Sequence, residues 1–310
     1  MDFERDGEGT APRTGRSPPS HGRPARPPPA YAALDLGTNN CRLLVARPAP
    51  DGFAVIDSFS RIIRLGEGVA ESGLISEAAI ERAIASIRIC AGKLRRWRVR
   101  RGRYVATEAC RKADNCVEFL DRVRYETGVQ LEIIGTAEEA ELAARGCGPL
   151  LTRRRDYGIV FDIGGGSTEV VWLGAKSGRR HCVLDSISLP IGVVTAADRL
   201  KGREITRELY EELKAEMRGP LAMFCERHEI ARKVREGRVQ MLGASGTVTT
   251  VAGIHKQLPR YRRDDVDGTL MEFADIDAVT DRLFDAGPDG RRANPCVGPE
   301  RADLVLPGCA

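Results

Sequence analysis

The sequence has no run of roughly 20 consecutive apolar residues, so it predicts no membrane-spanning helix. Four acidic residues near the amino terminus (Asp2, Glu4, Asp6, Glu8) disfavour a secretion signal. None of the nine cysteines forms a C-x-x-C pair, which excludes a zinc ribbon and offers no disulfide framework. Aromatic residues are scarce at 5%, and a net charge of +4 is too small to indicate a general polyanion binder. We therefore expect a soluble protein of a reducing cytoplasm, with neither a membrane nor a nucleic acid as partner.

What the chain does contain is length and glycine. Its 310 residues suggest two domains at ~150 residues each, and its 33 glycines are typical of an α/β enzyme whose loops approach a ligand closely. Residues 1–30 carry seven prolines and almost no large apolar side chain, which predicts a disordered tail. We place the first domain at 31–152 and the second at 153–310, with the boundary at the basic run 153–155.

Apolar spacing predicts alternating strands and helices in both halves. In the first half we expect a hairpin of YAALDLG and CRLLVAR around a turn at 37–40, and a helix capped by Ser76. The other expected elements there are a strand at 103–109, helices at 114–127 and 136–146, and a strand at 131–135. In the second half we expect strands at 158–164, 169–174 and 239–243, with helices near 206–228 and after Thr247.

Two segments repeat one pattern. A shift of 127 positions lays ALDLGTNNCRLLV (33–45) on VFDIGGGSTEVVW (160–172), with Asp35 on Asp162 and Gly37 on Gly164. Each copy reads as a strand ending in a carboxylate, a loop of small residues and a return strand, which indicates a duplication. The amides of such loops can converge on phosphate, and the carboxylate can hold a divalent cation or its water. One copy alone would favour an ordinary tight turn, whereas two matching copies favour a phosphate clamp.

A third small-residue loop, Gly243 to Thr247, follows a predicted strand and precedes a predicted helix. Orphan amides and the helix dipole make such a position suitable for an anion. The alternative is that Ser245 or Thr247 only caps the helix.

These segments resemble the exopolyphosphatase and guanosine pentaphosphate phosphohydrolase (Ppx/GppA) family of the actin-like, sugar kinase and Hsp70 superfamily. The resemblance runs from Tyr31 to the end of the chain, and its most specific part is DIGGGSTE at Asp162–Glu169. The family's other motifs resemble segments 35–40, 106–115, 138–142 and 243–247.

The resemblance implies two ribonuclease-H-like domains around an interdomain cleft and hydrolysis of phosphoanhydride bonds with release of orthophosphate. It implies that Glu139 is the general base, that Asp162 and Glu169, with Asp35, organise Mg²⁺, and that Asn39 and Arg111 contact the terminal phosphate. The remaining expected phosphate-binding residues belong to the three loops: Thr38, Gly165, Gly166, Ser167, Ser245, Gly246 and Thr247.

The family also sets expectations for the carboxyl-terminal part and for assembly. Its members continue past the segment at 298–310, so we expect a shortened second domain. We expect an irregular stretch at 286–292, where the family usually continues a helix. Dimers are common in the family, so a homodimer is among the assemblies that the resemblance allows.

Several of these residues have a purely structural alternative. Thr136-x-x-Glu139 is also a capping-box pattern, Glu138 could exchange roles with Glu139, and Glu169 could be an exposed charge on an edge strand. Seven basic residues between Lys93 and Arg103 suit a nucleic-acid groove, a polyphosphate channel or a solvated helix end. The four histidines show no ligand spacing and are expected to be surface or packing residues.

The leading hypothesis is a magnesium-dependent hydrolase of inorganic polyphosphate, with guanosine pentaphosphate as the close alternative substrate. A polyphosphate or nucleotide sensor without turnover is the second hypothesis. A sugar kinase is third, because the sugar-binding aspartate expected of one has no counterpart.

Overall fold

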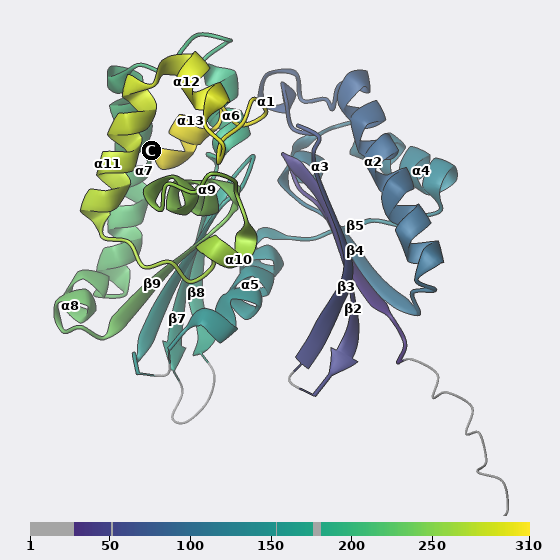
Figure 1. Ribbon diagram of the computed structural model, residues 1–310, viewed down its shortest axis with the longest axis horizontal. Coiled ribbons are helices and arrows are strands. Elements are labelled where there is room, and N and C mark those ends of the chain that lie inside the picture. The colour runs from purple at the N-terminus through teal and green to yellow at the C-terminus, as the bar shows by residue number, and fades with distance from the viewer. Residues whose placement is uncertain (1–27, 51, 153, 176–180) are drawn as a thin grey trace, which may run out of the picture.

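The computed structural model describes residues 28–50, 52–152, 154–175 and 181–310, so most of the expected tail at 1–30 lies outside the described residues. Two sheets stand side by side, each with helices on its outer face (Figure 1). This is the two-domain α/β architecture that the sequence predicts. Within the described ranges, no helix is long and apolar enough to cross a bilayer.

The first sheet has the strand order β3-β2-β1-β4-β5. Its strands are β1 (Tyr31–Leu36), β2 (Asn40–Ala49), β3 (Gly52–Ile62), β4 (Arg101–Ala106) and β5 (Glu132–Ile133). The hairpin expected at the start of this domain is present as β1 and β2, which pair antiparallel. The expectation of a strand at 103–109 is wrong at its carboxyl end, because β4 ends at Ala106 and Glu108 begins a helix. The strand expected at 131–135 is shorter, with two residues.

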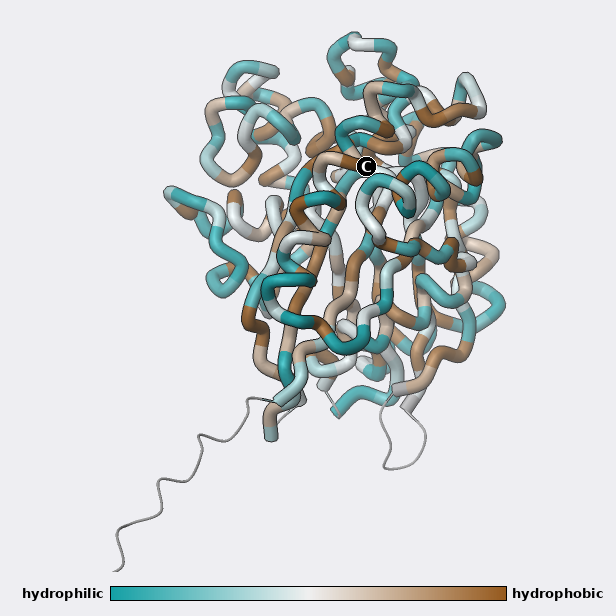
Figure 2. The backbone as a smooth tube through the Cα atoms, turned by 90° about the vertical axis from the view of Figure 1, so that its right-hand side faces the viewer, coloured by the Kyte–Doolittle hydropathy of each residue, from teal (hydrophilic) through white to brown (hydrophobic). Residues whose placement is uncertain are grey.

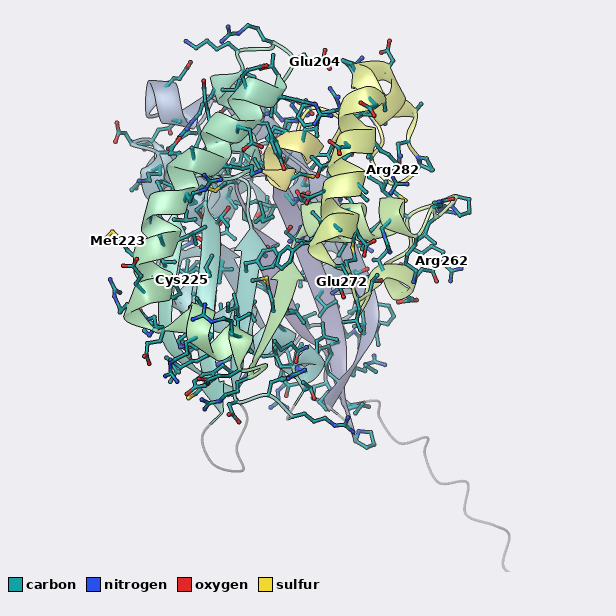
Figure 3. All side chains as sticks on the ribbon, turned by 90° about the vertical axis from the view of Figure 1, so that its left-hand side faces the viewer. Glu204, Met223, Cys225, Arg262, Glu272 and Arg282 are labelled. Carbon is teal, nitrogen blue, oxygen red and sulfur yellow. The ribbon has the colours of Figure 1, made fainter. Side chains whose placement is uncertain are left out.

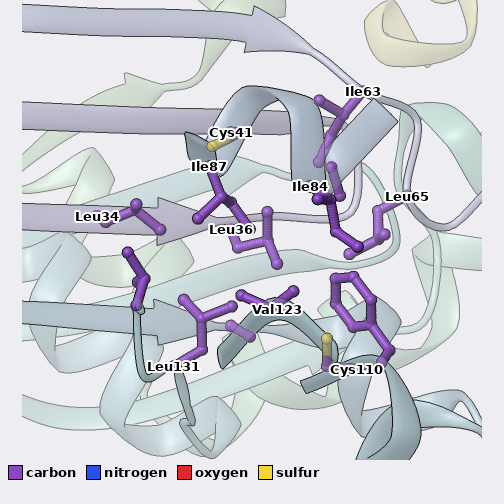
Figure 4. Close-up of a cluster of buried hydrophobic side chains, with 14 of the residues drawn as sticks. Leu34, Leu36, Cys41, Ile63, Leu65, Ile84, Ile87, Cys110, Val123 and Leu131 are labelled. Carbon is purple, nitrogen blue, oxygen red and sulfur yellow. The ribbon is translucent and has the colours of Figure 1, made fainter. Parts of the chain in front are cut away.

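Helices close one face of this sheet. They are α1 (Val69–Ser72), α2 (Glu77–Arg96), α3 (Glu108–Lys112) and α4 (Cys116–Thr127). Ser76 caps α2 as expected, since its side chain accepts a hydrogen bond from the Ala79 amide at 3.3 Å. Figure 4 shows the resulting core, where Leu34 and Leu36 of β1 face Ile84 and Ile87 of α2.

The second sheet has the order β8-β7-β6-β9. Its strands are β6 (Tyr157–Ile163), β7 (Thr168–Ala175), β8 (His181–Leu189) and β9 (Val239–Ala244). The sequence predicts three of these strands but neither β8 nor β3 of the first sheet. Each missed strand is the outer partner of a hairpin, and because few of its described side chains are buried, its sequence has no sustained apolar pattern.

The two sheets repeat one topology, which bears out the duplication. In each, a first strand pairs antiparallel with the second and parallel with a strand that follows a helical segment. The Gly37 amide donates to the Asn40 carbonyl at 2.9 Å, and the Gly164 amide donates to the Ser167 carbonyl at 2.9 Å. Even the register shift recurs, between Val45 and Ala46 in one copy and between residues 172 and 173 in the other.

The remaining helices are α5 (Thr136–Cys147), η1 (Gly148–Leu150), α6 (Val193–Arg199), α7 (Arg207–Arg227), α8 (Ile230–Arg235), α9 (Gly246–His255), α10 (Arg263–Val266), α11 (Phe273–Asp285), α12 (Gly287–Ala293) and α13 (Val305–Cys309). The expectation of an irregular stretch at 286–292 is wrong, because Gly287–Ala293 form the helix α12. Pro288 occupies the first turn of that helix, where proline's missing amide costs nothing. The carboxyl-terminal α13 buries Val305 and Leu306 in the core of the second domain.

Helix α5 lies between the two sheets (Figure 1). Its Ala140 and Ala144 pack against Val160, Val171 and Leu173 of the second sheet. The boundary expected between 152 and 153 therefore falls after a helix that packs on the second sheet.

Helices α7 and α8 cover the opposite face of that sheet. Figure 3 shows Met223 projecting outward from α7, away from the strands. In Figure 2 the apolar residues gather along the strands and the polar ones on the peripheral turns.

Candidate active site

The two repeated loops face and touch each other. A Cβ built on Gly165 would lie 2.9 Å from the Asn39 nitrogen and 2.9 Å from the Thr38 Cβ. One built on Gly166 would lie 3.0 Å from the Thr38 Oγ1. Only glycine permits this approach, which explains the GGG run. The two turns therefore face one another.

The second loop is held from behind by α6. The amides of Val193 and Val194 donate to the carbonyls of Gly164 and Gly165 at 3.0 and 2.8 Å. Gly192 passes so close that an added Cβ would lie 2.5 Å from the Gly165 carbonyl carbon. The backbone of the glycine loop is thus fixed by the protein before any ligand arrives.

The third loop completes the site with the amino terminus of α9. Ser245 caps this helix by accepting from the Val248 amide at 3.3 Å, as its structural alternative had it. The Ser245 backbone has φ 119 and ψ 170, a region that non-glycine residues rarely adopt. Strain of this kind persists where the surroundings over-determine the backbone, and it gathers at functional sites. Capping and a role in the cavity therefore coexist at this residue.

The three loops enclose a cavity of about 100 Å³ between the domains. Nine of the expected site residues line it: Asp35, Thr38, Asn39, Glu139, Asp162, Gly165, Ser245, Gly246 and Thr247. The Oδ1 atom of Asn39 is buried there without a hydrogen-bond partner among the described residues. An orphaned acceptor on a cavity wall indicates a missing donor, such as water or a ligand.

Four expected residues lie behind this lining. Arg111, Gly166, Ser167 and Glu169 do not form the cavity wall. Ser167 and Glu169 are almost fully buried. Arg111 donates to Glu139, and the Ser167 carbonyl accepts from the amide of Gly164, so these residues support the cavity wall from behind.

Glu139 lies in the first turn of α5 and points into the cavity. The capping-box interpretation is wrong: Gly135 is the cap position, and Thr136 makes no capping hydrogen bond. The Glu139 Oε2 instead accepts from the Arg111 Nη1 at 2.8 Å. Burial raises the pKa of Glu139 to about 7, with repulsion from Glu169 adding to it and Arg111 opposing it. A carboxylate with this pKa suits proton abstraction near neutral pH.

Glu138 points the other way. Its carboxylate accepts from the Arg103 Nη2 at 2.6 Å and remains 44% exposed. The possibility that it exchanges roles with Glu139 is therefore disfavoured by geometry, because adjacent helical residues lie about 100° apart around the axis.

Arg111 is held on both sides. Its Nη2 and Nε donate to the Glu108 Oε2 at 2.7 and 2.9 Å, and its Nη1 also donates to the Ile134 carbonyl at 2.9 Å. With Glu139 as a further acceptor, all three guanidinium nitrogens donate hydrogen bonds. Arg111 does not line the cavity itself, but it donates a hydrogen bond to Glu139, which does.

Glu169 is 3% exposed, so the interpretation as an exposed edge charge is wrong. β8 pairs with β7 and covers that edge. The Glu169 Oε1 accepts from the hydroxyls of Ser167 at 2.7 Å and Ser188 at 2.9 Å. These two donors hold a buried carboxylate that has no cationic partner within 4.0 Å among the described residues.

The cavity carries excess negative charge. Burial raises the pKa of Asp162 to about 6, with Arg42 opposing and Glu169 and Asp35 contributing. Burial likewise raises the pKa of Asp35, against the influence of Arg42. The Nη1 of Arg42 lies 3.9 Å from the Asp35 Oδ2. Carboxylates gathered in this way favour a cationic ligand.

Two arginines of this cavity, Arg42 and Arg301, are not among the predicted site residues. Arg42 pairs with Asp35 across β1 and β2, in the same register in which Glu169 pairs with Asp162. The 127-residue shift could have found it. Arg301 lines the cavity beside Gly246, and its Nη1 donates to the Thr250 Oγ1 at 3.1 Å. No local pattern indicates Arg301, since it comes from a turn before α13.

Two of the four histidines, His228 and His255, have described side chains, whereas His21 and the side chain of His181 lie outside the described residues. His228 contacts the Asp185 carboxylate at 2.7 Å, and His255 lies 3.8 Å from that of Asp275. Neither lines the cavity. In the described part of the chain, no group of three or more His, Cys, Asp or Glu side chains is placed to hold a metal on its own.

The chain is similar to known proteins both in sequence and in structure. A model of the Ppx/GppA phosphatase family matches residues 44–310. An exopolyphosphatase-like protein of known structure is 32% identical, with a TM-score of 0.77 over 90% of this chain and 85% of its own. A Ppx/GppA protein of Aquifex aeolicus is 28% identical, with a TM-score of 0.69 over 91% and 87% of the two chains.

A third solved structure is similar in fold. It is an exopolyphosphatase from Cytophaga hutchinsonii, 24% identical, with a TM-score of 0.79 over 90% of this chain and 88% of its own. This chain combines two paired hairpins, contact between their loops and a buried acidic cavity in one fold. The chain belongs to the Ppx/GppA phosphatase family, has the actin-like ATPase fold and is a phosphoanhydride hydrolase.

Proposed function

We propose that this enzyme releases orthophosphate from the end of inorganic polyphosphate by attack of a water molecule that Glu139 deprotonates. The observation that carries the proposal is one cavity lined by three small-residue loops and by a carboxylate with a pKa of about 7. Loop amides bind phosphate oxygens, and the carboxylate supplies the base.

The dimensions and chemistry of the cavity favour polyphosphate over guanosine pentaphosphate. Its volume of about 100 Å³ suits phosphate groups, whereas pockets for drug-sized ligands usually measure about 300–1,000 Å³. Among the described residues, none that lines the cavity has an aromatic side chain on which a guanine could stack. Guanosine pentaphosphate remains the second candidate because the family includes hydrolases of both.

In the proposed reaction, the loops hold the terminal phosphoryl group and Glu139 accepts a proton from the attacking water. The water oxygen bonds to phosphorus, the bridging oxygen leaves with the electron pair of the broken bond, and orthophosphate departs. Arg111 orients the Glu139 carboxylate, since Glu108 and the Ile134 carbonyl fix its guanidinium. Arg42 and Arg301 supply positive charge at the cavity wall.

Mg²⁺ is the proposed cofactor, and the residues present fit it. Asp35 and Asp162 line the cavity with raised pKa values, so their negative charge is incompletely compensated. Mg²⁺ keeps several waters and needs only one or two carboxylates when substrate phosphates complete its shell. Asp35 and Asp162 would hold the ion directly and Glu169 through water. Bound Mg²⁺ would neutralise charge on the phosphates.

We also propose that the reaction takes place in the cytoplasm. All nine cysteines, each of them among the described residues, carry free thiols, as a reducing compartment would maintain.

The test is release of orthophosphate by the purified chain from tripolyphosphate, long-chain polyphosphate and guanosine pentaphosphate. Release from polyphosphate, and its loss in a Glu139→Gln variant, supports the proposal. Preferential release from guanosine pentaphosphate would make the nucleotide the substrate. Tight retention of polyphosphate without release would make the protein a sensor.

A further inference from the structure

A cluster of arginines lies at the end of the first domain opposite the cavity. We define the basic end by its six members: Arg47, Arg95, Arg96, Arg98, Arg100 and Arg101. Within the described ranges, none of the six has a carboxylate oxygen within 4.0 Å. All but Arg47 are exposed. The basic run noted in the sequence therefore contains a concentration of uncompensated charge in a chain whose net charge is only +4.

The other members of the run are already paired. Lys93 donates to the Asp57 carboxylate at 2.6 Å, and Arg103 donates to Glu138 at 2.6 Å. The six arginines of the basic end have no such carboxylate partner within the described ranges. The basic end is therefore free to bind an external anion.

The sheet register places the basic end away from the cavity. Tyr31, at the start of β1, pairs with Arg101, whereas Leu36, beside the first loop, pairs with Ala106. Five strand residues at about 3.3 Å each separate the two ends by roughly 17 Å. The partner of Tyr31 in β2 is Ala46, which puts Arg47 at the same end. Figure 1 shows this end where the chain enters β1.

The chemistry of the basic end favours phosphates over bases. Its aromatic residue, Trp97, has the guanidinium groups of Arg47 and Arg96 over its ring at 5.7 and 5.5 Å. The Trp97 Nε1 donates to the Asp57 carboxylate at 2.7 Å. A single-stranded nucleic acid gains affinity by stacking bases on open aromatic faces, and this ring is already covered. Guanidinium groups bind phosphate oxygens without any base.

We propose that the basic end is a second binding site for polyphosphate, holding phosphates far from the one being cleaved. The inference rests on the proposed function, because it assumes that the polymer is the substrate of the cavity. Holding a distant part of the chain raises the effective concentration of its end at the cavity. A short polyphosphate cannot span the roughly 17 Å and gains nothing.

The first test is binding of end-labelled long-chain polyphosphate, measured by fluorescence anisotropy in a Glu139→Gln background to prevent hydrolysis. The test variant is Arg95→Gln/Arg101→Gln. The matched control is Arg218→Gln/Arg235→Gln, two exposed arginines of α7 and α8 that also lack a carboxylate partner in the described ranges. We expect the test variant to bind about three- to tenfold more weakly, and the control to bind as the parent does. The difference should shrink at high salt.

Equal affinity of all three proteins for the long chain would overturn the inference. Tighter binding of single-stranded RNA than of polyphosphate, lost in the test variant, would overturn the assignment of the partner. Both results are independent of catalysis.

The second test is steady-state hydrolysis without the Glu139→Gln change. We expect Arg95→Gln/Arg101→Gln to raise KM for long chains and to leave kcat and KM for tripolyphosphate unchanged. An equal rise in KM for tripolyphosphate would contradict the inference. If the parent enzyme hydrolyses neither substrate, the proposed function fails, while the anisotropy result still decides whether the basic end binds the polymer.

Discussion

Replacement of Glu139 by glutamine tests the proposed chemistry most directly. Glutamine preserves the side-chain length and can still accept from the Arg111 Nη1, which lies 2.8 Å from the Glu139 Oε2. It cannot accept a proton from water. General-base catalysis contributes about 10² to 10⁴ in rate, so we expect kcat to fall by that factor, equivalent to ~3–5 kcal/mol. KM should change little, because the three loops that bind phosphate are untouched.

The same residue predicts a pH dependence. Only ionised Glu139 can accept the proton, and its pKa is raised to about 7. We therefore expect the kcat/KM of the wild type to rise with pH through that value and to level off about one unit above it. Orthophosphate release from tripolyphosphate at a fixed ionic strength measures both the pH profile and the effect of the variant.

The matched control is Glu138→Gln. Glu138 is adjacent in sequence but 44% exposed and bonded to Arg103, outside the cavity. Its replacement should leave kcat within about twofold of the wild type, as expected for a surface ion pair. Equal losses in the two variants, or a Glu139→Gln enzyme that keeps its activity and pH profile, would refute the assignment of the base.

Three further predictions follow from the site. Asp162→Asn should lower activity yet raise the Tm at pH 7.5 in EDTA. The pKa of Asp162 is raised to about 6 in the folded protein, so the ionised carboxylate lowers the stability of the folded state at pH 7.5 by up to ~3 kcal/mol. This cost disappears below the unfolded-state pKa. An unchanged or lower Tm by scanning fluorimetry would contradict this. Gly192→Ala should lower both Tm and activity, by about 1–3 kcal/mol in stability, because its Cβ would meet Gly165, whereas Gly219→Ala on α7 has open space and should be tolerated. EDTA should abolish orthophosphate release and Mg²⁺ should restore it; activity that persists in excess chelator would exclude the metal.

Much of the site was accessible from local patterns. The carboxylates at the strand ends, the glycine loop and the repeat at a shift of 127 predicted both hairpins, and the structure brings their turns together. Strand ends and small-residue loops are encoded within a few residues of one another, so a linear pattern suffices.

The errors have a common cause. Thr136-x-x-Glu139 satisfies a capping pattern, but the Glu139 carboxylate bonds to Arg111, 28 positions away. Glu169 reads as an edge charge until Ser188, on a strand that the periodicity did not reveal, covers it and donates to it. In both cases a distant partner outweighs the local rule, because a buried carboxylate must find donors wherever the fold supplies them.

The linear order of residues thus determined the duplicated hairpins, the phosphate loops and the family motifs, each of which depends on neighbours along the chain. The folded arrangement decided which carboxylates are buried and therefore have raised pKa values. It also decided that α5 packs between the sheets and that Arg42 and Arg301 meet at one cavity. Burial and charge proximity depend on the distance between side chains in space, and segments that are far apart along the chain set that distance.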